Sequence, residues 1–289
     1  MLKCLYDVPA PAKLNLFLHI VGRRPDGYHL LQSVFVPIDW CDTLHFERRD
    51  DGRIARHDLG AVLPADDLCL RAARALQAAS GSRHGVDISI RKEVPWGAGL
   101  GGGSSDAAST LLALNRLWGL NWSRSRLMEL AVTLGADLPF FLGDGPAWVE
   151  GIGERLTPLR LAGERFYVVK PKASLPTAEI FRSPLLARDS SPAIVMDFLA
   201  QQSGFGKNDM QAAAQALCAE VEEAAVLLKS RFGNSRMTGS GSAVFARVQE
   251  KIGVENDAAF VEDIQLPEGW IGRQCRSLES HPLKGWLTD

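Results

Sequence analysis

A strict alternation of apolar and polar residues marks the first strand of the chain. In "KLNLFLHI", residues 13–20, Leu14 and Ile20 share one face with the leucines between them, and Lys13, Asn15 and Phe17 share the other. A period of two is that of a β-strand. The turn signal "RPDGYH" follows, and "LQSVFVPI" and "DTLHFER" predict two further strands joined near residues 39–42. The first fifty residues are therefore expected to form an antiparallel β-unit.

Helical spacing follows in the next hundred residues. A helix is predicted to open at Asp66 or Asp67, to run through "LCLRAARALQAAS" and to end at Gly81. The alternating segment "VDISIRKEV" predicts a strand. Residues 105–118 predict a second helix, and a third begins with Ser123 as its N-cap and ends at Gly135.

The second half of the chain mixes strands and helices without regular alternation. "RFYVVKP" predicts a strand, residues 209–231 one or two helices, "SRMTGSGSAVFARV" a glycine–serine turn leading into a strand, and "WIGRQCRSL" a last strand. This order favours an α+β fold over a doubly wound one. We predict a two-domain α+β protein, with an N-terminal nucleotide-binding domain over residues 1–155 and a smaller C-terminal α+β domain over residues 156–289.

Composition narrows the class of protein. Lys and Arg number 32 against 34 Asp and Glu, so the net charge of −2 predicts no nucleic-acid partner. No apolar run approaches the ~18 residues needed to cross a bilayer. The five cysteines form no CxxC pair, and the histidines show no metal-ligand spacing. We expect a cytoplasmic, soluble protein without a membrane partner; its oligomeric state stays open.

Five glycines lie between Gly97 and Gly103 in "PWGAGLGGGSSDAAS", directly before a predicted helix. Unpaired amides at a helix start carry partial positive charge, and glycine lets an anion approach the backbone closely. Ser104 and Ser105 could cap the helix or donate hydrogen bonds to a phosphate or a metal ion. The predicted phosphate-binding residues are Pro95, Trp96, Gly97, Ala98, Gly99, Leu100, Gly101, Gly102, Gly103, Ser104 and Ser105.

Three other interpretations of this loop are weaker. A Walker A loop requires a lysine after its glycines, and none is present. A dinucleotide-binding fingerprint is formally matched, but Pro95 and Trp96 interrupt the preceding strand and no acidic residue follows about 20 positions on. A plain flexible turn would not need five glycines in seven residues.

The loop resembles the phosphate loop of the GHMP kinases, P-x-x-x-G-L-G-S-S-A-A, with Gly102 and Gly103 inserted. Four more segments are similar to one branch of this group: "PAKLNLFLHIVGRRPDGYHLLQSVF", "LGADLPFFL", "PTAEIF" and "MTGSGSAVFA". Together they span residues 10–246, although residues 183–205 and the tail match no motif. The resemblance implies ATP-dependent phosphorylation of a cytidine diphosphate ester of methylerythritol in the non-mevalonate isoprenoid route.

Two alternatives remain beside this interpretation. Another GHMP small-molecule kinase, of the homoserine or mevalonate type, is disfavoured by the "PDGYH" turn and the triple glycine. A non-catalytic nucleotide-binding protein is disfavoured because Lys13 and Asp137 are both present.

The resemblance implies that Lys13 and Asp137 are catalytic. From the residues alone, Asp137 could equally cap a turn, and a strand lysine is usually solvated. In the family, an aromatic residue and a histidine at positions 28 and 29 hold the cytosine. The expected substrate contacts are Asn15, Tyr28, His29, Thr177, Phe181, Gly239 and Ser240. The expected cofactors are ATP and Mg²⁺, the ion held mainly by phosphates, water and a loop serine, without a protein carboxylate cage.

Overall fold

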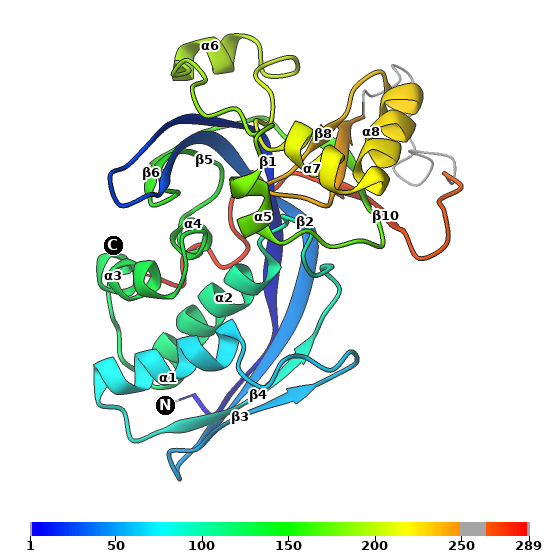
Figure 1. The fold of residues 1–289 in the computed structure, drawn as a ribbon. Coiled ribbons are helices and arrows are strands. Elements are labelled where there is room, and N and C mark those ends of the chain that lie inside the picture. Colours follow the sequence, from blue (N-terminus) through cyan, green and yellow to red (C-terminus); the bar gives the residue numbers. More distant parts are fainter. Residues whose placement is uncertain (1, 249–263, 288–289) are drawn as a thin grey trace.

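The computed structural model describes residues 2–248 and 264–287, which form four layers of secondary structure (Figure 1). Three helices within residues 68–134 cover one face of a six-stranded sheet, a four-stranded sheet packs on the other face, and two helices within residues 211–232 cover that second sheet. The mixed order of strands and helices agrees with the predicted α+β class. The predicted boundary between residues 155 and 156 stays a prediction.

Two long antiparallel strands, β1 (Cys4–Arg23) and β2 (His29–Arg49), run through the first sheet. The predicted antiparallel unit is thus present, but the prediction of two strands joined near residues 39–42 is wrong. Pro11 pairs with Cys41, whereas Lys13 pairs with Pro37, so the register between the two strands shifts at this point. The shift marks a β-bulge, and β2 continues through it as one strand.

The rest of the first sheet flanks β2. Its strand order is β3-β4-β2-β5-β6, with β1 also paired to β2 and β3 parallel to β4. These strands are β3 (Ile54–Asp58), β4 (Gly85–Arg91), β5 (Ala147–Gly151) and β6 (Arg155–Pro158). Of these, only β4 is predicted from the alternation of its residues.

The helices on this sheet are α1 (Leu68–Ser80), α2 (Gly102–Leu117), α3 (Arg124–Leu134) and the single turn α4 (Leu138–Phe141). Asp67 caps α1 by accepting a hydrogen bond from the Leu70 amide, and Ser123 caps α3, as predicted. The prediction that Ser104 or Ser105 caps α2 is wrong. The helix begins earlier, and Gly101 is its N-cap with no side-chain hydrogen bond.

The second sheet has the order β10-β7-β9-β8 and lies in the second half of the chain. Its strands are β7 (Arg165–Lys170), β8 (Arg236–Met237), β9 (Val244–Arg247) and β10 (Ile271–Arg276). The helices of this half are α5 (Thr177–Arg182), α6 (Val195–Ala200), α7 (Gln211–Leu217) and α8 (Ala219–Phe232). The predicted strands and the helical region 209–231 are therefore present.

The two sheets share a core that contains part of β1. Leu14 and Leu16 of β1 pack there with Phe166 and Phe245 of the second sheet. Phe17, which alternation places beside Lys13, also joins this core and is fully buried. The register of β1 shifts between Asn15 and Leu18, so strict alternation fails at that point.

The glycine loop before α2 rests against the turn before β9. The Ser242 amide donates to the Gly97 carbonyl at 3.2 Å, and the Ala243 amide donates to the Ala98 carbonyl at 3.1 Å. A Cβ atom on Gly99, whose φ is +73°, would overlap the Thr238 carbonyl oxygen. Part of the need for glycine therefore comes from the packing of the protein itself.

We expect Gly99→Ala to lower the free energy of unfolding by about 2–4 kcal/mol, because it combines a positive φ with backbone overlap. Gly103→Ala is the matched control. Its Cβ would meet only Leu68 Cδ1, at 3.7 Å, and alanine in a helix is favoured over glycine by roughly 0.8–1 kcal/mol. Urea unfolding followed by tryptophan fluorescence measures both; equal losses in the two variants would contradict this account.

Candidate active site

Lys13 and Asp137, which are distant in sequence, form an ion pair. Lys13 Nζ lies 3.7 Å from Asp137 Oδ2; the side chain of Lys13 is 3% exposed and that of Asp137 is 35% exposed. Asp137 stands at the N-cap position of α4 but makes no side-chain capping hydrogen bond. Its carboxylate is therefore not occupied in holding the helix, as the alternative interpretation of this residue required.

The side chain of Lys13 is buried among polar and aromatic groups. Its Nζ donates to Asn15 Oδ1 at 2.5 Å and lies 4.5 Å from the centre of the Phe35 ring. Its backbone amide donates to the Leu100 carbonyl at 2.9 Å, which ties β1 to the glycine loop. Burial lowers the pKa of Lys13, and the Asp137 carboxylate acts against this shift by favouring the ammonium.

Asn15 connects Lys13 to the second glycine turn. In the side chain of Asn15, Oδ1 also accepts from Thr238 Oγ1 at 3.2 Å, and Nδ2 donates to Ser33 Oγ at 3.0 Å. The backbone amide of Asn15 donates to Thr238 Oγ1 at 3.0 Å. Asn15 is 1% exposed. It shares the face of Lys13, as its spacing predicts. Its carboxamide holds the ammonium in place, a role that the sequence did not indicate, and Thr238 is a residue that the sequence analysis missed.

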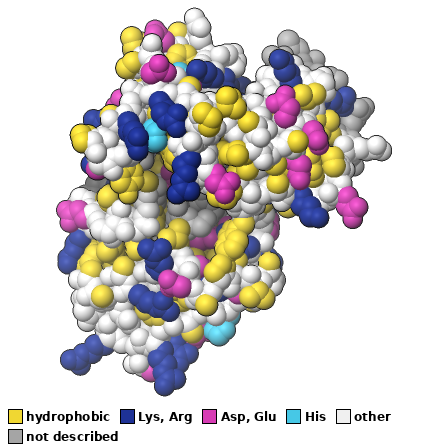
Figure 2. Space-filling model, in the orientation of Figure 1, with side chains coloured by type: hydrophobic (Ala, Val, Ile, Leu, Met, Phe, Trp, Pro, Cys, Tyr) yellow, Lys and Arg dark blue, Asp and Glu magenta, His cyan; other side chains and the backbone are white. Residues whose placement is uncertain are grey.

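The start of α2 meets the ion pair at Gly101. A Cβ on Gly101 would lie 3.1 Å from Lys13 Cγ and 2.9 Å from Phe141 Cζ, at the end of α4. The first amides of α2 have no partner within the helix and point outward. Figure 2 shows that the surface is hollowed between α2 and α5. Ala98 and Leu100 have buried side chains, so this loop offers its backbone to a ligand.

A buried charged cluster beneath the loop was not predicted. Lys92 Nζ bridges Asp42 Oδ2 and Asp106 Oδ2, and Asp42 Oδ1 accepts from the amides of Glu93 and Val94 at 2.6 and 2.8 Å. Burial raises the pKa of the Asp106 carboxyl, against the effect of Lys92. The cluster fixes the chain entering the glycine loop to both β2 and α2.

A cavity of about 290 Å³ lies beside this loop. Its walls include Pro64, Lys92, Trp96, Gly103 and Asp106. Trp96 is 53% exposed, so its ring is available at the rim. The cavity thus extends the surface formed by the glycine loop.

The fit of a magnesium ion depends on the loop serines. Ser105 Oγ is buried and has no hydrogen-bond partner among residues 2–248 and 264–287. The same residues contain no group of three or more His, Cys, Asp or Glu side chains arranged to hold a metal. The donor set fits an ion held mainly by a ligand's own phosphates, with one serine hydroxyl from the protein.

The remaining predicted residues form two groups. The rings of His29 and Phe181 stack, with centroids 4.7 Å apart and planes 12° apart, and Tyr28 beside them is 60% exposed. Thr177 Oγ1 and Ser240 Oγ lie 2.8 Å apart, which links α5 to the second glycine turn.

Gly239 connects the second glycine turn to the Lys13 region, because its Cβ would lie 3.0 Å from the Gly99 carbonyl oxygen and 3.5 Å from Asn15 Oδ1. The pair of His29 and Phe181 lies near the turn between β1 and β2, further along β1 than Lys13.

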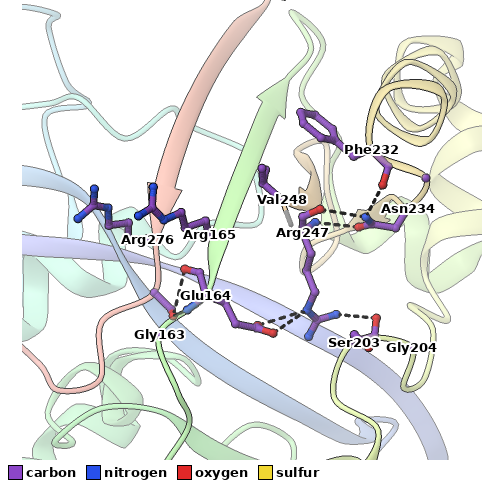
Figure 3. A pocket seen from close by; sticks show the side chains of 12 residues that line it. Gly163, Glu164, Arg165, Ser203, Gly204, Phe232, Asn234, Arg247, Val248 and Arg276 are labelled. Carbon is purple, nitrogen blue, oxygen red and sulfur yellow. Dashed lines mark hydrogen bonds and ion pairs between the residues drawn. The ribbon is translucent and has the colours of Figure 1, made fainter. Parts of the chain in front are cut away.

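A larger cavity of about 810 Å³ lies elsewhere (Figure 3). Glu164, Arg247 and Asn234 are among its lining residues, and Arg247 Nε lies 3.2 Å from the Glu164 carboxylate. It is at the end of β9 opposite to the 238–243 turn and shares no residue with the predicted site.

Comparison with known proteins decides the family. Residues 67–145 match the model of the GHMP kinases N terminal domain. The chain is 63% identical over 285 residues to 4-diphosphocytidyl-2-C-methyl-D-erythritol kinase of Methylibium petroleiphilum, covering 99% of both chains. The chain belongs to this kinase family. The protein of the same name from Paracidovorax citrulli is 56% identical over 292 residues, covering 100% of this chain and 99% of the other.

Solved structures agree with membership of the family. A crystal structure of 4-(cytidine 5'-diphospho)-2C-methyl-D-erythritol kinase matches with a TM-score of 0.73 and 38% identity, covering 83% of this chain and 89% of the other. Mevalonate kinase of Methanococcus jannaschii shares the fold, with a TM-score of 0.64 at 15% identity, covering 95% and 98%. The chain is an ATP-dependent small-molecule kinase with the α+β GHMP kinase fold.

None of the helices within residues 2–248 and 264–287 has the length and apolar character of a membrane span.

We expect Asn15→Leu to lower the free energy of unfolding by about 2–4 kcal/mol, because the Lys13 ammonium and Thr238 Oγ1 lose an acceptor and the buried Ser33 Oγ loses a donor. Ser240→Ala serves as the control, since its hydroxyl pairs with Thr177 at an exposed position and surface changes usually alter stability by about 0.5 kcal/mol or less. Thermal unfolding by calorimetry compares them. The same midpoint for both variants would show that the carboxamide does not hold this region together.

Proposed function

We propose that the protein transfers the γ-phosphoryl group of ATP to a hydroxyl of 4-diphosphocytidyl-2-C-methyl-D-erythritol, in the non-mevalonate route to isoprenoid precursors. The observation that carries this proposal is the Lys13–Asp137 ion pair at the start of α2. Relatives at 56–63% identity over nearly the whole chain bear the name of this kinase, which supports the same acceptor.

Asp137 receives or orients the proton of the attacking hydroxyl. Its carboxylate is partly exposed and makes no capping bond, so an acceptor hydroxyl can reach it. Lys13 is fixed by Asn15 and paired with Asp137, and its ammonium stabilises negative charge as the phosphoryl group moves. Phosphoryl transfer depends mainly on position and charge, so a rigid pair of this kind supplies what the reaction needs.

The glycine loop, residues 95–105, holds the triphosphate of ATP through its backbone amides and the start of α2. The cavity of about 290 Å³ next to Trp96 and Gly103 takes the nucleotide base, because it opens beside the same loop. Ser105 would hold a magnesium ion together with the phosphates, and such an ion would supply positive charge to the phosphate oxygens.

The acceptor is held on the other side of the ion pair. Tyr28, His29 and Phe181 hold its cytosine by stacking and by a hydrogen bond from the imidazole, and His29 Nε2 is buried without a partner among the described residues. Thr177, Gly239 and Ser240 lie between this aromatic group and Asn15, and they bind the part of the acceptor that connects the cytosine to the reacting hydroxyl.

Removing the Asp137 carboxylate tests the catalytic pair. We expect Asp137→Asn and Asp137→Ala to lower kcat by about 10²–10⁴-fold, the usual contribution of a positioned general base, with little change in KM for ATP. Asp144→Asn is the control, because Asp144 pairs with Arg124 at the surface and such pairs contribute little. A coupled assay of ADP release measures all three. Normal kcat in the Asp137 variants would remove this residue from the mechanism.

A panel of acceptors tests the substrate. The cytidine diphosphate ester should be phosphorylated, whereas mevalonate and homoserine should give no ADP above the rate without acceptor. Formation of phosphomevalonate or phosphohomoserine instead would select the other GHMP kinase type. Calorimetric binding of ATP without transfer to any acceptor would select a non-catalytic protein.

A further inference from the structure

The segment after α5 carries no motif, yet it reaches the aromatic group at His29 through Arg188. Arg188 Nη2 donates to the Phe181 carbonyl at 2.9 Å and to the Ser183 carbonyl at 3.1 Å, and its Nη1 donates to the Leu186 carbonyl at 3.1 Å. These carbonyls come from the last turn of α5 and the chain that follows it, where backbone acceptors lack helical partners. One guanidinium thus binds three backbone carbonyls at the C-terminal end of α5 and just beyond it.

We propose that Arg188 is a positioning residue for the acceptor's nucleobase: by fixing the backbone of Phe181, it holds the Phe181 ring flat against His29. The planes of the two rings are 12° apart. The backbone of His29 is fixed because it belongs to β2, and the backbone of Phe181 is fixed by its hydrogen bond from Arg188. This inference rests on the proposed function for its ligand. Its geometry does not depend on that function.

Arg188 also affects the protonation of His29. Burial lowers the pKa of His29, and the positive charges of Arg188 and then Arg23 lower it further. Arg23 lies opposite His29 in the β1–β2 ladder, and Arg188 belongs to the chain after α5, so the two cations that act on the imidazole come from different segments.

The uncharged imidazole suits an uncharged base. A neutral histidine has one donor and one acceptor nitrogen, whereas the protonated form can only donate. Cytosine presents both kinds of group on its edge. His29 Nε2 has no partner in the described part of the chain, so a hydrogen bond to the base would not have to replace an existing one.

Two substitutions separate the charge of Arg188 from its hydrogen bonds. Arg188→Gln removes the charge, so the pKa of His29 should rise toward its ordinary value of about 6.5. Arg188→Lys keeps the charge but cannot bind several carbonyls with a planar fork, so the pKa of His29 should stay near that of the wild type. In both variants KM for the cytidine ester should rise about tenfold, with KM for ATP and kcat within about twofold.

Arg182→Gln is the matched control, because Arg182 is an exposed arginine in the last turn of α5, next to Phe181 in the sequence. Histidine NMR titration of the protein without ligand gives the pKa of His29, assigned with His29→Asn, and steady-state kinetics gives both KM values. The result that would overturn the proposal is an unchanged KM for the cytidine ester in Arg188→Gln and Arg188→Lys, with the same His29 titration as in the wild type.

The two proposals fail in different ways. If the wild type does not phosphorylate the cytidine ester, the proposed function fails, while the NMR titrations still report whether Arg188 acts on His29. If the wild type is active and the Arg188 variants behave as Arg182→Gln does in both measurements, only the role of Arg188 is lost.

Discussion

The backbone contact between the two glycine turns holds the active site together. Main-chain hydrogen bonds join residues 97–98 to residues 242–243, and Gly99 lies against Thr238 so closely that no side chain fits. Thr238 then binds Asn15, and Asn15 binds Lys13. A lysine on the first strand is therefore positioned by a turn more than two hundred residues later. Because the same loop leads into α2, the ammonium and the helix start are fixed relative to each other.

Buried charge is the second constraint on this site. Lys13 and Lys92 are both inside the protein, where an unpaired ammonium is strongly disfavoured. Lys92 pairs with Asp42 and Asp106, whose side chains are buried with it, and this cluster fixes the chain that enters the glycine loop. Lys13 has one carboxylate partner, Asp137, and that partner is partly exposed. In the proposed function, this difference leaves Lys13 to act on the reacting groups, whereas Lys92 supports the glycine loop.

Local patterns predicted the elements well, and contacts between distant segments explain the failures. The caps at Asp67 and Ser123 are short-range features, so sequence was sufficient there. Phe17 left its predicted face because the register of β1 shifts against β2, which alternation cannot show. The cluster of Asp42, Lys92 and Asp106 joins residues 50 and 14 positions apart. The structure brings Lys13 and Asp137 together, although the roles of the motif residues stay predictions, and Thr238 and Arg188 could be found only in the structure.

Fold and specificity come from different parts of the chain. Mevalonate kinase shares this fold at 15% identity, so the layered sheets alone cannot select a cytidine ester. In the proposed function, the phosphates bind at the glycine loop, β1 and α4, whereas the cytosine binds at the turn before His29 and at α5 with the chain that follows. The proposed role of Arg188 rests on hydrogen bonds to backbone carbonyls, and such contacts leave no sequence motif.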